Sequence, residues 1–376
     1  NGSVSAYQFM RKLIENLQIT PAQLALDPFS GSCVVVDPNT GEVLALVSYP
    51  SYDNNKLANG IDAEYYASLQ NDLSLPLWDY ATQMRSAPGS TYKMVVASAA
   101  LMDGIINLSS TVDCVGNFTR DSDIVMRCWN RSGHGNLNVT EAITHSCNYF
   151  FYEMGYRFGQ SGDPESGTDF NLANERMREY ADLYGLTEKS GIEIEESAPQ
   201  FSLVNPSQSA IGQGEHNYTT VGLARYVATV ANSGTCYNLS LLDKVTDRSG
   251  NLLKDFSPEV RNTIEMPTSY WDAIHRGMRG VVEAKKYFVD SGIIAAGKTG
   301  TAEESKTRPP HAVFVGYAPF DKPEIALATR IGNGYSSDYA AQISCKVMQY
   351  YFNPEKEEEI ISGTANHLEA VTSAGD

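Results

Sequence analysis

The stretch "SAPGSTYKMVVASAALMDG", residues 86–104, places a serine and a lysine just ahead of a long apolar run. Pro88 and Gly89 end any regular secondary structure that precedes them, and the run to Met102 has the periodicity of a helix. A helix that is apolar on every side is buried, so the stretch predicts a central helix of the fold. Its unusual feature is Lys93, a charged residue within that buried surface.

Ser90 and Lys93 lie three positions apart and therefore share a face of this helix. Burial disfavours the ammonium form and lowers the pKa of a lysine, and a neutral lysine beside a serine can act as its general base. Ser90 also lies at the helix N-terminus, where free backbone N–H groups favour developing negative charge. The pair predicts a nucleophile, a base and half an oxyanion hole. The alternative is a serine N-cap beside a lysine that reaches solvent.

Composition excludes some classes of protein. The 376 residues, 42% of them hydrophobic, suffice for one large globular domain or two ordinary ones. A net charge of -17 argues against a nucleic-acid partner. No apolar run approaches the roughly 18 residues that span a bilayer, and the chain opens without a signal-peptide pattern. It is therefore either cytosolic or an excised piece.

Cys33, Cys236 and Cys345 are interpreted as small core residues.

Strand-like segments lie near both ends of the chain: two within 33–50, and one each in 291–305, 311–320 and 323–332. From about 90 to 290 the pattern is mainly helical, so one sheet built from distant segments would carry a helical insertion. Amphipathic helices are predicted at 6–17 and 338–352. The acidic, then small and polar tail from Glu355 is expected to be mobile.

A second motif is Ser146-Cys147-Asn148, at a predicted junction of helices. A hydroxyl and a carboxamide two positions apart in a turn can both point into a cleft. The alternative interpretation is an ordinary helix cap.

A third motif, Lys298-Thr299-Gly300-Thr301, falls in a predicted strand. Period two puts the two threonines on one side and Lys298 with Gly300 on the other, and Gly300 lets another backbone approach closely. A competing Lys189-Ser190-Gly191 lacks the apolar lead-in of residues 293–296, so the motif at 298 is interpreted as the functional one.

Ser-x-x-Lys, Ser-x-Asn and Lys-Thr-Gly in this order resemble the motifs of the penicilloyl serine transferases. With "GHGNLNVTEAITHSCNYFFYEMG", "IGQGEHNYTTVGLARYVATVANSG" and "HAVFVGYAP", residues 33–350 resemble a class B penicillin-binding protein of the elongation, or cell-shape, subgroup. Asp79-Tyr80 departs from the Asn-Arg of many relatives. The resemblance implies a mixed α/β fold: a five-stranded antiparallel sheet with helices on both faces, plus a helical subdomain. It implies a transpeptidase domain over 1–354, with the helical subdomain at about 87–290, and a polar tail over 355–376.

The implied activity is peptidoglycan D,D-transpeptidation. Ser90 would attack the penultimate D-Ala of a stem peptide while Lys93 takes its proton. Ser146, together with Lys298, would protonate the leaving D-Ala, and Asn148 would hold Lys93 and the substrate amide. The backbone N–H groups of Ser90 and Thr301 would form the oxyanion hole. The substrate-binding strand would consist of Thr299, Gly300 and Thr301. β-Lactams, which mimic D-Ala-D-Ala, would leave a stable acyl-enzyme.

Two other classes remain open. One is a serine β-lactamase or D,D-carboxypeptidase on the same fold, although the sequence shows no clear base for a deacylating water. The other is a non-catalytic β-lactam sensor. The resemblance also implies no catalytic cofactor, a membrane glycosyltransferase as partner, and a location outside the cytoplasmic membrane, held by an N-terminal segment that precedes this chain.

Cys114, Cys128, His134 and Cys147 form a possible metal set, since three thiols and an imidazole match the composition of closed structural zinc sites. Their spacing matches no zinc finger. Some relatives of the elongation subgroup carry an Asp, Asp, His, Cys zinc site beside the Ser-x-Asn turn, and His134 and Cys147 resemble two of those ligands. A Cys114–Cys128 disulfide and simple packing of Cys147 are the alternatives.

Overall fold

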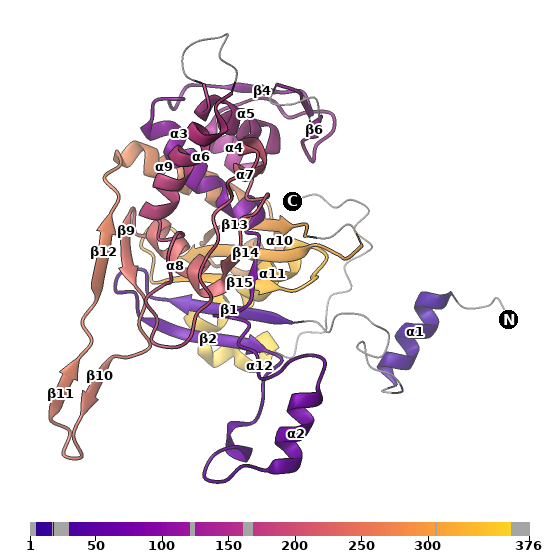
Figure 1. Ribbon diagram of the computed structural model, residues 1–376, viewed down its shortest axis with the longest axis vertical. Coiled ribbons are helices and arrows are strands. Elements are labelled where there is room, and N and C mark those ends of the chain that lie inside the picture. The colour runs from indigo at the N-terminus through magenta and orange to yellow at the C-terminus, as the bar shows by residue number, and fades with distance from the viewer. Residues whose placement is uncertain are drawn as a thin grey trace.

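The structure, a computed structural model, describes residues 5–16, 18, 30–120, 125–160, 168–304 and 307–361 (Figure 1). Its centre is a five-stranded antiparallel sheet of order β13-β14-β15-β1-β2. The strands are β1 (Gly31–Val36), β2 (Val43–Tyr49), β13 (Ala296–Ala302), β14 (His311–Ala318) and β15 (Ile325–Ile331). The two ends of the chain meet where β1 pairs with β15, with Gly31 opposite Ile331. The predicted five-stranded sheet is confirmed.

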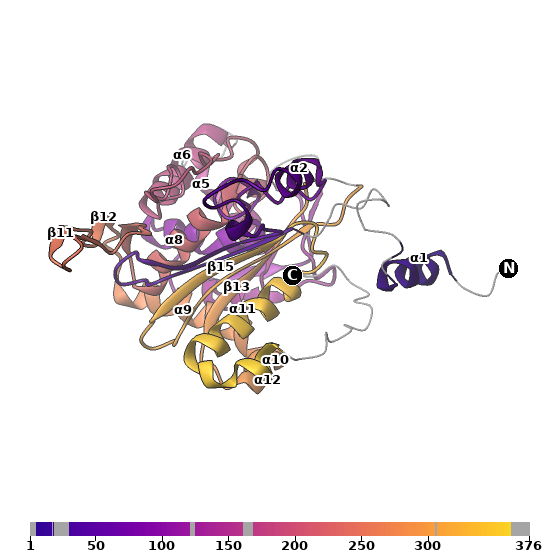
Figure 2. The ribbon, with the colours of Figure 1, turned by 90° about the horizontal axis from the view of Figure 1, so that it is seen from below.

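Alternate residues of β1 contribute to two separate hydrophobic cores. Val34 and Val36 pack in the core that contains α8 (Thr220–Ala231), whereas Val35 packs in the core that contains α11 (Ser337–Phe352). Since successive side chains of a strand point to opposite faces, α8 and α11 cover opposite faces of the sheet, as Figure 2 shows. Helices on both faces, and the helix predicted over 338–352, are therefore confirmed.

Helix α3 (Lys93–Met102) lies at the centre of the helical region, and every residue from Lys93 to Leu101 is buried. This is the environment that its apolar sequence predicts. The helices packed against it are α5 (Asn148–Phe158), α6 (Phe170–Leu183) and α9 (Thr268–Glu283). Shorter helices nearby include α4 (Val139–Thr144), α7 (Pro206–Ser209) and α10 (Lys286–Ser291).

Short two-stranded ribbons interrupt the region interpreted as helical, because strands of two to five residues carry little periodicity in a sequence. The pairs are β3–β8 (Arg85–Ser86, Tyr218–Thr219), β4–β7 (Val112–Cys114, Gly135–Leu137), β5–β6 (Asn117–Phe118, Met126–Arg127), β9–β12 (Thr235–Asn238, Glu259–Thr263) and β10–β11 (Lys244–Thr246, Leu252–Asp255). The β10–β11 hairpin projects from the body as an arm (Figure 1).

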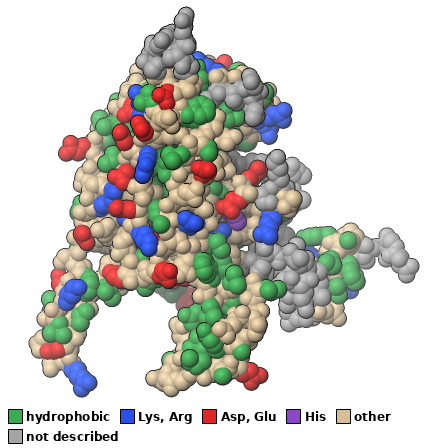
Figure 3. All heavy atoms as spheres, viewed as in Figure 1, with side chains coloured by type: hydrophobic (Ala, Val, Ile, Leu, Met, Phe, Trp, Pro, Cys, Tyr) green, Lys and Arg blue, Asp and Glu red, His purple; other side chains and the backbone are tan. Residues whose placement is uncertain are grey.

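A lobe between β2 and η3 (Gly89–Tyr92) contains the short turn η2 (Asn54–Lys56) and α2 (Ala63–Asn71). Hydrophobic side chains gather on its surface in Figure 3, and Ile61 and Leu73 are largely exposed there.

The two ends of the described chain are helical. Helix α1 (Ala6–Glu15) confirms the N-terminal helix, with residue 17 outside the described residues. The first part of the tail that is expected to be mobile forms η4 (Pro354–Lys356) and α12 (Glu357–Ile361). Lys346 of α11 donates to the carbonyl of Ile360 at 2.9 Å and holds α12 in place. Residues 362–376 lie outside the described residues. Within the described ranges, no helix has both the length and the apolar character to cross a membrane.

Candidate active site

Ser90 lies in a single 3-10 turn, η3, instead of in the first turn of an α-helix. The α-helix begins three residues later, at Lys93, so the serine and the lysine keep the one-turn separation that the sequence predicts. Both side chains are buried, with Ser90 3% and Lys93 0% exposed. A lysine that reaches solvent, the alternative considered from the sequence, does not describe Lys93.

Glycines allow η3 to pass between β13 and the loop that follows α7. The N–H of Gly89 donates to the carbonyl of Gly212 at 3.0 Å. A Cβ atom on Gly89 would lie 2.6 Å from the carbonyl oxygen of Thr301, and one on Gly300 would lie 2.5 Å from that of Pro88. Backbones approach this closely only where side chains are missing. The expected close approach at Gly300 is confirmed, and the approaching segment is the one that carries the nucleophile.

Ser146 occupies the tight turn between α4 and α5, with φ at +49°. Cys147 fixes this turn twice, because its N–H donates to the carbonyl of Ala142 at 2.9 Å and its Sγ accepts from the N–H of Phe150 at 3.5 Å. Asn148 is the first residue of α5. The predicted helix junction is confirmed, and the helix cap in it is Cys147.

Two buried lysines converge on Ser146. Nζ of Lys93 lies 3.1 Å from Ser146 Oγ, 2.9 Å from the carbonyl oxygen of Ser146 and 2.7 Å from Oδ1 of Asn148. Nζ of Lys298 lies 2.8 Å from the same Oγ and 3.0 Å from the carbonyl oxygen of Thr299. The three sequence motifs therefore meet at one hydroxyl. These acceptors are neutral oxygens, so the two amines are held close together without a carboxylate among these contacts.

Strand β13 is an edge strand of the sheet, and its side chains alternate as the sequence predicts. Lys298 reaches Ser146 of the helical region, and Gly300 faces Thr91 of η3, so both point to the same side. Thr299 is 2% exposed and Thr301 is half-buried. Lys189 of the competing motif is exposed.

A second cluster of polar residues ties the end of β13 to the two residues before Pro88. Glu304 accepts from the N–H of Ala87 at 3.2 Å and pairs with His311 Nε2 at 3.1 Å. Arg330 donates from Nε to Ser86 Oγ at 3.0 Å. His311 keeps the pKa of Glu304 below its usual range, although burial opposes this. The segment that leads into η3 is thus held from β13, β14 and β15.

The four residues of the possible metal set come together beside the Ser146 turn. Cys114, Cys128 and Cys147 are buried free thiols, so the disulfide considered from the sequence is not present. All four ligand atoms, including that of His134, lie within 4.8 Å of one another. His134 Nδ1 lies 3.5 Å from Cys114 Sγ and 3.6 Å from Cys128 Sγ, and the sulfurs of Cys128 and Cys147 are 4.0 Å apart.

The thiols of this cluster are unequal. A hydrogen bond from Cys147 lowers the pKa of Cys128, and the same contact, with burial, raises the pKa of Cys147. Burial raises the pKa of Cys114. A lowered thiol pKa favours the thiolate form of Cys128, and a thiolate is the form that binds a metal cation. The compact set of donors around it is therefore suited to such an ion.

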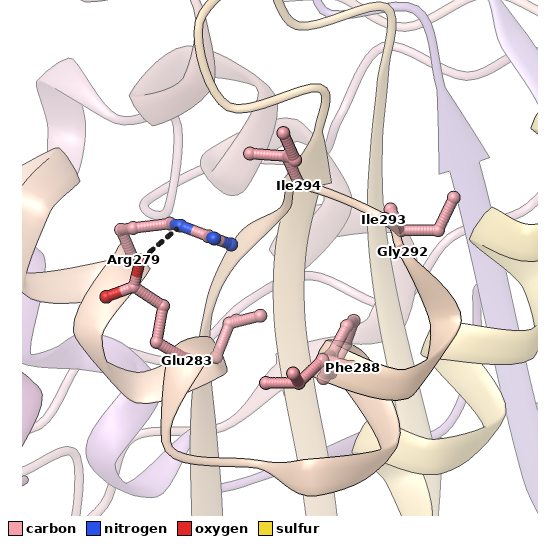
Figure 4. Close-up of a pocket in the computed structure, with 8 residues that line it drawn as sticks. Arg279, Glu283, Phe288, Gly292, Ile293 and Ile294 are labelled. Carbon is pink, nitrogen blue, oxygen red and sulfur yellow. Dashed lines mark ion pairs between the residues drawn. The ribbon is translucent and has the colours of Figure 1, made fainter.

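The pocket in Figure 4, about 160 Å³ in volume, does not contain the motif residues. It lies between α9, α10 and the residues that lead into β13. Val282, Phe288 and Ile293 line it, and an Arg279–Glu283 ion pair of 3.0 Å closes one side.

Sequence reasoning missed several residues that support the site. Gln213 donates from Nε2 to the carbonyl oxygen of Thr301 at 3.2 Å. Asp79 accepts from Ser48 Oγ at 2.6 Å and from the N–H of Ala81 at 2.8 Å. The sequence signal for Gln213 was its place in "IGQGE", whereas the role of Asp79 depends on a strand distant in sequence.

The sheet, the helical region and the three converging motifs define a serine acyl-transfer fold of the penicillin-recognising class. A family model described as the penicillin-binding protein transpeptidase domain matches residues 31–349. The chain therefore belongs to the penicillin-binding protein transpeptidase family, and within it to the class B proteins of the elongation subgroup.

Named relatives agree with this assignment. The chain is 31% identical over 366 residues to the peptidoglycan D,D-transpeptidase MrdA of Haemophilus influenzae, covering 87% of this chain and 54% of that protein. It is similar to the structure of Pseudomonas aeruginosa PBP2 in complex with WCK 5153, with a TM-score of 0.72, 27% identity and coverage of 90% and 74%. A chain of a peptidoglycan synthase complex gives a TM-score of 0.73 at 27% identity, covering 90% of this chain and 57% of that one. The chain thus spans about half the length of its curated relative.

Proposed function

We propose that this chain is the catalytic domain of a serine-type D-Ala-D-Ala transpeptidase that cross-links peptidoglycan stem peptides. The observation that carries the proposal is the position of Ser146 Oγ, 3.1 Å from Lys93 Nζ and 2.8 Å from Lys298 Nζ, beside the buried turn that holds Ser90. A hydroxyl held by two amines can relay protons during acyl transfer. The name of the H. influenzae relative supports the same reaction.

In the proposed acylation, Ser90 Oγ attacks the carbonyl carbon of the penultimate D-Ala and Lys93 takes its proton. The new oxyanion accepts from the backbone N–H groups of Ser90 and Thr301, whose approach the glycines of η3 and β13 permit. Ser146, held by Lys298, passes a proton to the nitrogen of the leaving D-Ala. Acylation thus breaks one amide bond and forms one ester bond.

The edge of β13 binds the donor peptide in this proposal. Thr299 and Thr301 bind its terminal carboxylate beside the charge of Lys298, Gly300 leaves room for the chain, and Asn148 holds Lys93 and the substrate amide. An amine of a neighbouring stem peptide then takes the acyl group. A β-lactam occupies the same place and stays bound, because its acyl-enzyme lacks an efficient acceptor.

The two alternative functions predict different fates for a penicillin adduct. A β-lactamase on this fold releases the adduct within a second, whereas a transpeptidase retains it for hours. A D,D-carboxypeptidase hydrolyses a D-Ala-D-Ala peptide without needing an acceptor amine. A sensor acylates but forms no cross-linked product.

Catalysis by this set of residues needs no cofactor, and we propose a structural zinc ion at Cys114, Cys128, His134 and Cys147. A tetrahedral zinc ion, with bonds of about 2.3 Å to sulfur and about 2.0 Å to nitrogen, spaces its ligand atoms roughly 3.4–3.8 Å apart. Three of the spacings between donors, 3.5, 3.6 and 4.0 Å, are close to these values, and all four donor atoms lie within 4.8 Å of one another. The ion would tie the segment before α4 to Cys147, and so hold Ser146 and Asn148 in place.

The wider organisation is also proposed. Residues 1–354 form the transpeptidase domain, with a helical subdomain at about 87–290 and a polar C-terminal tail. The whole protein lies on the outer side of the bacterial cell membrane, is anchored by a segment before this chain, and works with a membrane glycosyltransferase. The similarity to a chain of a peptidoglycan synthase complex, which is described as coordinating polymerization and crosslinking, supports such a partner.

Mass spectrometry after incubation with benzylpenicillin tests the proposed function. One adduct per chain is expected, on the peptide that contains Ser90, and Ser90→Ala should form none while keeping its melting temperature. An adduct that persists in Ser90→Ala contradicts the assignment of the nucleophile. Cross-linked product from a pentapeptide donor and an amine acceptor separates the transpeptidase from the sensor.

A further inference from the structure

The loop between α7 and β8 contacts both segments that carry the proposed oxyanion donors. Its Gly212 accepts from the N–H of Gly89, the residue before Ser90, at 3.0 Å. Its next residue, Gln213, donates from Nε2 to the carbonyl oxygen of Thr301 at 3.2 Å. Two successive residues of one loop thus hold η3 through the backbone and β13 through a side chain.

The contact with Thr301 lies on the edge of β13 that faces away from β14. A Cβ atom on Gly89 would lie 2.6 Å from the oxygen and 3.1 Å from the nitrogen of Thr301, so both backbone atoms face η3. The N–H and C=O of one residue point to the same side of a strand. Gln213 therefore forms a hydrogen bond with Thr301, the same residue whose N–H points toward η3.

The base of this loop is well fixed. The N–H of Gly212 donates to Ser209 at 2.9 Å, and that of Gln213 to Gln208 at 3.2 Å. Ser202 Oγ lies 2.7 Å from Ser209 Oγ and accepts from the N–H of Glu215 at 3.1 Å. A side chain that extends from such a base can set the position of the strand that it contacts.

We propose that Gln213 is a positioning residue for the oxyanion hole: its carboxamide holds Thr301 so that the N–H groups of Thr301 and Ser90 converge on one oxygen. This inference rests on the proposed function. Without the contact, the loop no longer holds the Thr301 end of β13, and the separation of the two donors becomes variable. Catalytic groups lose much of their effect when they are displaced by about 1 Å.

The test is the kinetics of acylation by nitrocefin, resolved into the binding constant of the first complex and the rate constant of acylation. Gln213→Glu keeps the size of the side chain but replaces the donor with an acceptor that repels the Thr301 carbonyl. Gln213→Met removes the donor without adding charge. Gln208→Glu, at an exposed position of α7 directly before the loop, is the matched control for charge and backbone effects.

For both Gln213 variants the acylation rate constant should fall about tenfold, less than the 10²–10³ seen when an oxyanion donor is deleted, because the donor is displaced and not removed. The binding constant should stay within about twofold of that of the parent protein, and the melting temperature within about 2 °C. For Gln208→Glu, the acylation rate constant, the binding constant and the melting temperature should all stay within these limits. Deacylation should slow in parallel, since it uses the same oxyanion hole.

An unchanged rate constant in Gln213→Met, with Ser90→Ala inactive as proposed, overturns this inference and leaves the proposed function standing. The inference is also overturned if the Gln213 variants lose acylation rate only in proportion to their loss of folded protein. That result would mean that the loop contact has only a structural role. Acylation of Ser90→Ala instead removes the proposed function itself.

Discussion

Lys298 Nζ lies 2.8 Å from Ser146 Oγ, although 152 positions separate the two residues. The contact joins the edge strand of the sheet to the turn between α4 and α5, and Lys93 approaches the same hydroxyl from the helical core. Removing either amine leaves the hydroxyl with one remaining buried lysine.

Lys298→Ala should slow acylation by benzylpenicillin on the order of 10²–10⁴-fold, the range for losing one group that transfers a proton or stabilises charge. Lys189→Ala is the control, because Lys189 belongs to the competing Lys-Ser-Gly sequence and is exposed. It should acylate at the rate of the parent protein. Stopped-flow measurement of both variants decides between the two motifs, and a larger loss in Lys189→Ala would show that the wrong one has been assigned.

Gly300→Ala should damage both stability and acylation. Its Cβ would lie 2.5 Å from the carbonyl oxygen of Pro88, and this close contact with backbone can be relieved only by moving β13 from η3. Overpacking of this kind costs about 1–3 kcal/mol. Gly31→Ala, in β1 of the same sheet, would meet its nearest atom at an ordinary 3.4 Å and should be tolerated. Urea unfolding and acylation rates measure the difference, and equal behaviour of the two variants would contradict this account.

The sequence predicts the parts of the fold that have strong periodicity. The strands of the central sheet and helix α3 have continuous apolar or alternating patterns, and β1, β2, β13, β14 and β15 appear where they are expected. Ribbons such as β3–β8 could not be predicted, because Arg85–Ser86 and Tyr218–Thr219 pair over a distance in sequence and are each two residues long. The helix at 357–361 was missed because an acidic run predicts only that the segment is exposed. It does not distinguish an exposed helix from an exposed coil.

For the candidate site, the sequence identifies residue types but not their supports. Ser90, Lys93, Ser146 and Lys298 are visible as short motifs, and the residue order indicates their family. Gln213 could not be assigned a contact in this way, because its partner is a backbone oxygen of Thr301, and any residue supplies such an oxygen. The thiols at 114 and 128 were recognised by composition alone, since their meeting depends on the pairing of β5 with β6 and on the hydrogen bond from the N–H of Cys128 to the carbonyl of Gly116 at 2.8 Å.

Acid should destabilise the protein partly through His216. This imidazole is fully buried against Tyr92, and burial lowers its pKa to about 3. An unfolded histidine has a pKa of about 6.5, so below that pH the unfolded chain binds a proton that the folded chain does not. The contribution is constant above about pH 6.5 and is lost as pH falls from there toward 3. The total loss is on the order of 5 kcal/mol.

The measurement compares the parent protein with His216→Phe by urea unfolding at pH 7, 6 and 5. Phe keeps an aromatic ring beside Tyr92 but cannot titrate. It also loses the hydrogen bonds of Nδ1 with the N–H of Ser202 and the hydroxyl of Tyr218, a loss that is independent of pH. The stability advantage of the parent protein should therefore shrink as pH falls. A constant difference across this range would mean that His216 does not account for the acid sensitivity.

Metal removal should loosen the Ser146 turn. If zinc binds Cys114, Cys128, His134 and Cys147, protein purified without chelator should contain about one zinc per chain by atomic emission. Cys147 is also the N-cap of α5, so His134→Ala is the cleaner probe: it removes a ligand without touching the Ser146–Asn148 backbone. That variant should lose zinc and melt at a lower temperature, as should the parent protein after treatment with a strong chelator.

Cys345→Ser supplies the control for loss of a buried thiol, since Cys345 is a residue of α11, packs in the other core and donates to the carbonyl of Tyr287. It should keep its zinc. Added Zn²⁺ should restore the melting temperature of the chelated parent protein but not that of His134→Ala, because a ligand that binds only the folded state stabilises that state. Metal-free protein with the same melting temperature before and after chelation would exclude the site, and the close spacing of the thiols would then reflect only the packing of three small residues around the α4–α5 turn.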